Sequence, residues 1–173
     1  MKRIMVIGVS SGVGKSTFAK NLGEALNIPA VHLDSLFWKP GWVEASVEEF
    51  KDAQREVVLM ERWVIDGNYS NSYDVRERHA DTVIYLELPL RICLYRVFKR
   101  YWMNRGTTRP DLGEGCTEKL DVQFLKFIIT TYKRRKNQMA DRLRRYEEEG
   151  KTVIVLKSKE EIASFLEKVR GLT

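Results

Sequence analysis

The sequence predicts an α/β fold with three layers, in which about five parallel strands lie between two layers of helices. Five short segments have strand length and an almost unbroken apolar character, which is typical of strands buried on both faces of a sheet. Segments with a helical spacing of apolar residues separate these strands along the chain. A glycine-rich turn joins the first strand to the first helix.

The expected elements alternate from the first residues to the last. In the first helix, Phe18, Leu22 and Leu26 recur at intervals that place them on one apolar face. The expected strands are 2–8, 30–33, 63–65, 82–86 and 152–156, and the expected helices are 14–26, 46–60, 89–104, 118–148 and 159–170. This alternation favours a parallel sheet, because each helix returns the chain to the edge where the next parallel strand begins.

The composition is that of a globular protein. A chain of 173 residues with 43% hydrophobic and 31% charged residues is expected to form a single domain over 1–173. Residues 105–117 are rich in glycine and small polar residues, and we expect them to form a lid loop in a helical lid region. Cys93 and Cys116 are too few for a disulfide framework and lack the paired spacing of a zinc site. No segment approaches the roughly 20 apolar residues that span a bilayer, so we expect no membrane association and a cytoplasmic location.

Positive charge is concentrated in the second half of the chain. Residues 1–90 carry 10 Lys and Arg against 13 Asp and Glu, and residues 91–173 carry 20 against 11. The two halves therefore have formal charges of −3 and +9, within a total of +6. Such a gradient attracts anions, either nucleotide phosphates or a nucleic-acid backbone.

The strongest motif is Gly12-Val13-Gly14-Lys15-Ser16-Thr17, which lies between an expected strand and an expected helix. This is the context of a Walker A motif, the phosphate-binding P-loop of P-loop NTPases. Its glycines let backbone N–H groups converge on phosphate oxygens, and the helix N-terminus adds its dipole. Lys15 is expected to reach the β and γ phosphates of ATP, and Ser16 is expected to offer its hydroxyl to Mg²⁺.

One position departs from the Walker A pattern. The first glycine of the pattern falls at Val9, whereas the available glycine is Gly8. Either the loop is one residue longer than the pattern, or Val9 is tolerated in the turn.

Further strings indicate a family. They are His32-Leu33-Asp34, Phe37-Trp38-Lys39-Pro40-Gly41-Trp42, Asp66-Gly67-Asn68-Tyr69, Thr108-Arg109-Pro110-Asp111 and Gly113-Glu114-Gly115-Cys116. With the P-loop, they make nearly the whole chain resemble the adenylate-kinase-like small P-loop kinases, and most closely the bacterial DNA topology modulation proteins. The resemblance implies a kinase that moves the γ-phosphate of ATP to a small acceptor.

Asp66 is the candidate second magnesium residue. It ends an apolar strand, which puts its carboxylate at the carboxyl edge of the sheet, where a Walker B aspartate holds Mg²⁺. A turn residue or helix cap is the alternative. Adenylate kinases follow this Asp-Gly pair with Phe-Pro-Arg, whose arginine grips the acceptor phosphate, but Asn68 and Tyr69 follow here. This difference weakens the case for a nucleoside monophosphate acceptor.

The resemblance also implies roles for two arginines of one helix. Arg96 matches an arginine that stacks on adenine, and Arg100 matches one that contacts phosphate. They are four residues apart and so share one face of the helix. An ordinary solvated basic face is the alternative interpretation.

Further arginines are expected to contact phosphate. Arg105 and Arg109 lie in the expected lid, from which they would bring positive charge to the transferring phosphate. Arg142 matches an arginine of a later helix, with Arg134 or Arg135 as its possible partner. A surface helix with ion pairs is an equal alternative for these last two residues.

Asp34 is the key residue for the acceptor. It follows the second expected strand, and related small-molecule kinases use an aspartate there to bind or deprotonate an acceptor hydroxyl. A phosphate acceptor needs no base, so Asp34 favours a hydroxyl acceptor. Trp38 and Trp42 either stack on a ligand or form a small local core. His32 is interpreted as a packed histidine rather than a ligand.

The favoured function is therefore an ATP- and Mg²⁺-dependent phosphotransferase acting on a nucleotide, a nucleoside or another hydroxyl compound. The alternative is an ATP-binding regulator of DNA topology, which the basic second half suggests but no nucleic-acid-binding motif supports. A GTPase is disfavoured because the chain has no Asn-Lys-x-Asp string to read guanine. The sequence indicates neither the acceptor nor an oligomeric state.

Overall fold

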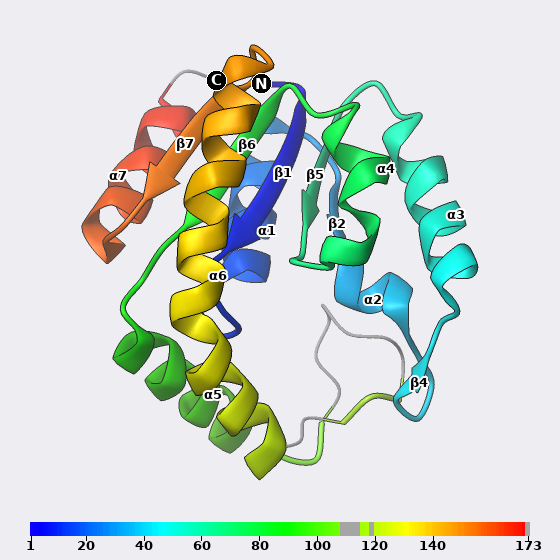
Figure 1. Cartoon of the computed structure of the whole chain (residues 1–173), viewed down its shortest axis with the longest axis vertical. Coiled ribbons are helices and arrows are strands. Elements are labelled where there is room, and N and C mark those ends of the chain that lie inside the picture. Colours follow the sequence, from blue (N-terminus) through cyan, green and yellow to red (C-terminus); the bar gives the residue numbers. More distant parts are fainter. Residues whose placement is uncertain (108–114, 118–119, 172–173) are drawn as a thin grey trace.

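The computed structural model describes residues 1–107, 115–117 and 120–171 (Figure 1). The central sheet consists of β1 (Arg3–Gly8), β2 (Ala30–His32), β5 (Trp63–Asp66), β6 (Thr82–Leu86) and β7 (Thr152–Leu156). A separate antiparallel hairpin consists of β3 (Trp38–Lys39) and β4 (Val43–Glu44). The helices are α1 (Lys15–Leu26), α2 (Leu33–Phe37), α3 (Val47–Val58), α4 (Tyr73–Glu77), α5 (Leu90–Asn104), α6 (Val122–Glu148) and α7 (Lys159–Arg170), with a 3-10 turn at Ser70–Ser72.

The five strands of the central sheet are all parallel, as predicted, in the order β2-β5-β1-β6-β7. Strand β1 is central, and its Val6 lies opposite Asp66 of β5 and Ile84 of β6. The chain runs from β1 to the β2 edge and later crosses to the other side of β1. The carboxyl end of β1 thus lies where the strand order reverses, which is where open α/β sheets bind ligands.

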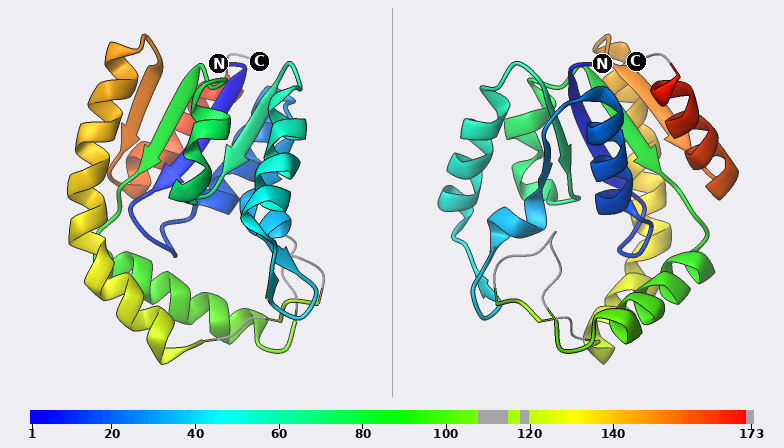
Figure 2. Two further views of the ribbon diagram at one scale, coloured as in Figure 1. Left: turned by 45° about the vertical axis from the view of Figure 1, so that its right-hand side comes forward. Right: turned by 180° about the vertical axis from the view of Figure 1, so that it is seen from behind.

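Helices cover both faces of the sheet, which confirms the expected three layers. Helices α1 and α7 lie on one face, and α4 and α6 lie on the other (Figures 1 and 2). Helix α3 packs outside the sheet against α4. Helix α5 and the adjoining part of α6 extend beyond the carboxyl ends of the strands (Figure 1).

Burial of the strands follows their place in the sheet. The inner strands β5 and β6 are buried along their whole length, and β1 is buried from Ile4 onward. The edge strands β2 and β7 are mostly half-buried. Apolar burial of this kind is the main favourable term in folding, whereas the parallel backbone pairing of β5 with β1 and β2 sets the register of their carboxyl ends.

Side-chain caps set the helix boundaries more sharply than periodicity does. Helix α3 begins with a capping box, in which Ser46 and Glu49 satisfy each other's backbone N–H groups. Helix α6 begins at Val122 rather than at 118, because the Asp121 side chain accepts a hydrogen bond from the N–H of Gln123.

Short elements between β2 and β6 carry no long period and were not predicted. They are α2, the β3–β4 hairpin, the 3-10 turn and α4. Of the expected lid loop 105–117, the part at 108–114, including Arg109, lies outside the described residues. Every helix in the described part of the chain is too short or too polar to cross a lipid bilayer.

Candidate active site

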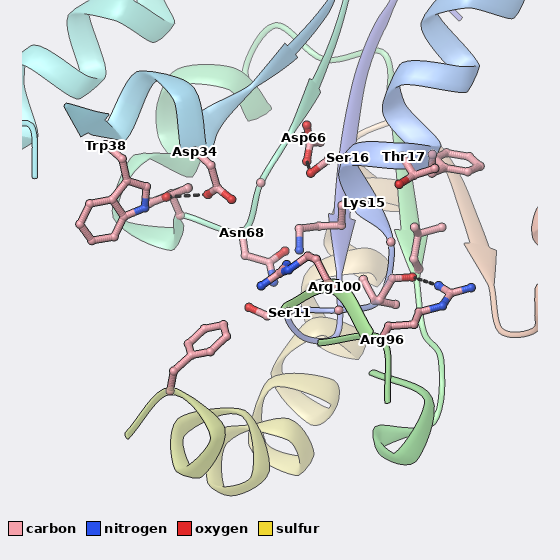
Figure 3. Close-up of a pocket in the computed structure, with 18 of the residues that line it drawn as sticks. Ser11, Lys15, Ser16, Thr17, Asp34, Trp38, Asp66, Asn68, Arg96 and Arg100 are labelled. Atoms are coloured by element: carbon pink, nitrogen blue, oxygen red, sulfur yellow. Dashed lines mark hydrogen bonds between the residues drawn. The ribbon is translucent and has the colours of Figure 1, made fainter. Parts of the chain in front are cut away.

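A large open cavity lies at the carboxyl ends of the strands, with a volume of about 1280 Å³ (Figure 3). Its volume exceeds the roughly 300–1,000 Å³ that is usual for one small ligand, so there is room for two. Most sequence-predicted site residues line it. They are Gly12, Val13, Gly14, Lys15, Ser16, Thr17, Asp34, Asp66, Arg96 and Arg100. The cavity therefore brings the phosphate-binding loop and the candidate acceptor residue together.

Two glycines of the P-loop have conformations that other residues rarely adopt. Gly12 has φ 79° and Gly14 has φ 102°. A Cβ atom on Gly12 would lie 2.2 Å from the carbonyl oxygen of Cys93 in α5. The P-loop thus packs directly on α5, and only glycine fits at this contact.

Backbone and side-chain hydrogen bonds hold the start of the P-loop. Val9 is buried, and its N–H donates to the carbonyl of Leu86, so it extends the strand and packs in the core. Gly8 is held by Asn68, which accepts from its N–H at 2.9 Å and donates to its carbonyl at 2.7 Å. Asn68 therefore fixes the residue that precedes Val9 at the start of the P-loop.

Helix α1 points its N-terminus at the cavity. No side chain caps it among the described residues, so its first N–H groups are available to an anion. Burial lowers the pKa of the Lys15 ammonium, and the carboxylates of Asp34 and Asp66 oppose this shift. The charges of Arg100 and Arg135 also lower the pKa of Lys15, so three cations act on one region of the cavity. This region is suited to a polyphosphate.

Asp66 is held between two side chains. The Ser16 hydroxyl donates to Asp66 Oδ2 at 3.0 Å, and Asp66 Oδ1 makes a short contact with His32 Nδ1. Hydroxyl and carboxylate oxygens are ligands that Mg²⁺ prefers, and Mg²⁺ commonly takes only one or two of them from the protein. The residues present therefore fit a magnesium ion that also binds phosphates. His32 is half-buried, as expected of a packed histidine, but its contact with Asp66 was not anticipated.

Asp34 lies on the side of the cavity opposite Arg96 (Figure 3). The Tyr69 hydroxyl donates to Asp34 Oδ1 at 2.7 Å. Burial and the neighbouring Asp34 carboxylate raise the pKa of Tyr69, so this phenol remains a proton donor at neutral pH. One oxygen of Asp34 is thereby engaged, whereas no hydrogen bond from the described part of the chain reaches Oδ2.

The aromatic residues beside Asp34 pack on each other. Ring centroids lie 5.0 Å apart for Phe37 and Trp38, 5.1 Å for Trp38 and Trp42, and 4.8 Å for Phe37 and Tyr69. Trp42 also donates from its indole N–H to the carbonyl of Thr117 at 3.0 Å. The local-core interpretation of the two tryptophans is therefore supported, although both also line the cavity.

The helix arginines differ in position. Arg96 donates to the carbonyl of Val13 at 2.7 Å, so it also holds the P-loop. Arg100 extends toward Lys15 and Asn68 (Figure 3).

Arg142 is not brought to the cavity. Its guanidinium donates to Glu77 at 3.0 Å and lies over the ring of Tyr73, which ties α6 to α4. Arg142 is therefore engaged outside the cavity lining in this structure, and its contact with phosphate stays a prediction. Arg135, considered from the sequence only as a possible partner, lines the cavity instead.

Asn68 and Tyr69 are the site residues whose roles the sequence did not reveal. The sequence showed them only as a departure from Phe-Pro-Arg. The available signal was their position directly after the strand that ends at Asp66, since residues there face the same edge as the P-loop.

The fold is that of small P-loop kinases. A shikimate kinase from Bacteroides thetaiotaomicron is similar with a TM-score of 0.58 and 19% identity, covering 99% of this chain and 97% of that one. A shikimate kinase from Aquifex aeolicus gives 0.55 and 17%, covering 98% and 97%. A gluconokinase from Sinorhizobium meliloti gives 0.54 and 15%, covering 98% and 90%.

Similarity in sequence covers less of the chain than similarity in structure. No protein-family model matches the chain. An uncharacterized protein of Bacillus subtilis, YqaC, is 30% identical over 108 residues, which are 58% of this chain and 59% of that protein. The match therefore spans less than two thirds of that relative.

Proposed function

We propose that the protein transfers the γ-phosphate of ATP to a hydroxyl group of a small molecule. The observation that carries this proposal is that Lys15, at the start of an uncapped helix, and Asp34, with one oxygen still available, line the same cavity. The first suits a triphosphate and the second suits an acceptor hydroxyl. The kinases of the same fold act on shikimate and gluconate by name, and both are hydroxyl compounds.

The part of the cavity beside Lys15, where the phosphates would bind, has more cationic than anionic groups. Lys15, Arg100 and Arg135 act on it together, and the first N–H groups of α1 add four orphan donors. These groups would hold the β and γ phosphates and stabilise charge on the transferring group. Mg²⁺, when bound beside Ser16 and Asp66, would neutralise phosphate charge. Arg96, beside Val13, is the candidate contact to the adenine.

The transfer step requires one proton to move. The oxygen of the acceptor hydroxyl would form a bond to the γ-phosphorus while the bond between that phosphorus and the oxygen of the leaving ADP breaks. Asp34 Oδ2 would accept the proton that the hydroxyl loses. Tyr69 would hold Asp34 in place and prevent rotation of its carboxylate. Lys15 would lie against the phosphates throughout.

The direct experiment incubates the protein with γ-labelled ATP, Mg²⁺ and a panel of sugars, cyclic hydroxy acids, nucleosides and nucleoside monophosphates. We expect label on a hydroxyl compound and about a 100-fold lower kcat for Asp34→Asn, with ATP affinity unchanged. Asp52→Asn is the matched control, because Asp52 is exposed on α3 and pairs with Arg55. Label found only on nucleoside monophosphates, or full activity of Asp34→Asn, would contradict the proposal.

A further inference from the structure

Helix α4 contains a fully buried arginine that does not line the cavity. Arg76 is 0% exposed, whereas Arg78, the C-cap residue that directly follows α4, is exposed. Burying a charged group is costly unless hydrogen bonds replace its water. A guanidinium at such a place therefore calls for a specific explanation.

Arg76 donates almost entirely to the segment that follows β5. Its Nη2 donates to the carbonyls of Gly67 at 3.1 Å and Tyr69 at 3.5 Å. Its Nη1 donates to the carbonyl of Ser72 at 3.3 Å and to the Ser72 hydroxyl at 3.1 Å. One planar group thus contacts three backbone carbonyls between residues 67 and 72.

The guanidinium is itself anchored from α3. Gln54 is 0% exposed, accepts from Arg76 Nη1 at 2.7 Å and donates to the carbonyl of Phe50 at 3.0 Å. Burial lowers the pKa of Arg76 to about 10, which leaves the side chain charged at neutral pH. Carbonyl oxygens, the Ser72 hydroxyl and the Gln54 amide therefore replace water at Nη1 and Nη2, whereas Nε is buried with no hydrogen-bond partner among the described residues.

The segment held in this way carries both contacts that organise the site. Asn68 fixes Gly8 at the start of the P-loop through two hydrogen bonds. Tyr69, the next residue, fixes Asp34 through one. Gly67 must lie close to α2, since a Cβ on it would be 2.7 Å from the Leu33 side chain.

We propose that Arg76 is a positioning residue that sets the phosphate-binding and acceptor halves of the cavity relative to each other through residues 67–69. The inference rests on the proposed function in that Gly8 and Asp34 are taken as parts of the two halves. Arg76 touches neither ligand and acts only through Asn68 and Tyr69. Lysine cannot replace it, because one ammonium lacks the planar fork that reaches Gln54 and the carbonyls together.

The test compares Arg76→Lys with Arg78→Lys by hydrogen exchange measured on the whole chain. Amides of Gly8, Gly67 and Ser72 report on the segment, because they donate to Asn68, Val6 and Tyr69 respectively. We expect these amides to exchange at least about tenfold faster in Arg76→Lys, while amides of β7 keep their protection. Arg78→Lys is expected to leave both sets unchanged.

A second readout separates positioning from simple loss of stability. Once a hydroxyl acceptor has been identified, Arg76→Lys and Tyr69→Phe are each expected to lower kcat about tenfold. In the double variant, the fold loss in kcat is expected to be much smaller than the product of the two single losses. Faster exchange at every strand, unchanged exchange at the three reporter amides, or fully multiplicative losses in kcat would each overturn the proposal. If no acceptor is phosphorylated by the wild type, the proposed function fails, and the exchange experiment still decides the role of Arg76.

Discussion

The contact between Gly12 and helix α5 gives the sharpest test of the P-loop geometry. In Gly12→Ala, the new methyl group would lie 2.2 Å from the carbonyl oxygen of Cys93 and 2.8 Å from a methyl of Val97. The backbone of α5 must therefore move, or the P-loop must move away from it. Gly150 provides a matched control, because it has φ 78° against 79° for Gly12, and nothing lies within 4 Å of its Cβ position.

The difference between the two variants isolates the contact. An alanine at positive φ lowers the free energy of unfolding by about 1–2 kcal/mol at either position. The lower entropy of the unfolded chain raises it by about 0.4–1 kcal/mol in both variants. These terms cancel in the comparison. Overpacking adds about 1–3 kcal/mol to Gly12→Ala alone. We therefore expect the free energy of unfolding to be lower in Gly12→Ala than in Gly150→Ala by that amount.

Urea unfolding measures this difference, and calorimetric titration with Mg²⁺ and ATP measures its consequence for the site. A displaced P-loop no longer directs its N–H groups at the phosphates, so we expect ATP affinity to fall at least about tenfold in Gly12→Ala and not in Gly150→Ala. Equal unfolding free energies and equal ATP affinities for the two variants would refute the packing of the P-loop on α5.

Ser16→Ala is expected to raise the Mg²⁺ concentration needed for half-maximal ATP binding about tenfold, because the variant lacks an oxygen ligand and the hydrogen bond to Asp66. Unchanged magnesium dependence in the calorimetric titration would contradict the assignment of Ser16 to the metal. Arg142→Ala is expected to lower the free energy of unfolding by about 1–3 kcal/mol through loss of the pair with Glu77, without changing ATP affinity, and a large loss of affinity would instead support a phosphate contact. The pKa of Asp81 is lowered because hydrogen bonds from Thr82 and two backbone N–H groups outweigh its desolvation. Its stabilisation is therefore present at neutral pH and lost as the pH falls through the native pKa, so unfolding of the wild type should depend more steeply on acid than unfolding of Asp81→Asn.

The sequence was sufficient to predict the strands because each is a short apolar run that can be recognised without knowing its neighbours in the sheet. The expected bounds of β6 and β7 coincide with the observed ones, and the P-loop lies where its motif and context predicted. The kinase fold of the resemblance is confirmed, whereas the particular closeness to DNA topology modulation proteins stays a prediction.

The sequence was insufficient to predict the role of a side chain that depends on residues distant in the sequence and near in the fold. Asn68 acts on a residue 60 positions away, and no local pattern encodes such a contact. Arg142 was matched through a family helix, but an acidic partner on α4, Glu77, determines its direction. Arg76 had no motif at all, and only its burial reveals it.

The most direct test of the account is the affinity of the protein for ATP with Mg²⁺, measured by calorimetry for the wild type, Lys15→Ala and Lys20→Ala. Lys20 lies exposed on the same helix and pairs with Glu24, so it controls for the loss of one positive charge. We expect saturable binding to the wild type, a loss of at least about tenfold for Lys15→Ala, and no change for Lys20→Ala. Absence of binding to the wild type, or equal affinities for all three proteins, would contradict the claim that the turn before α1 holds a nucleoside triphosphate.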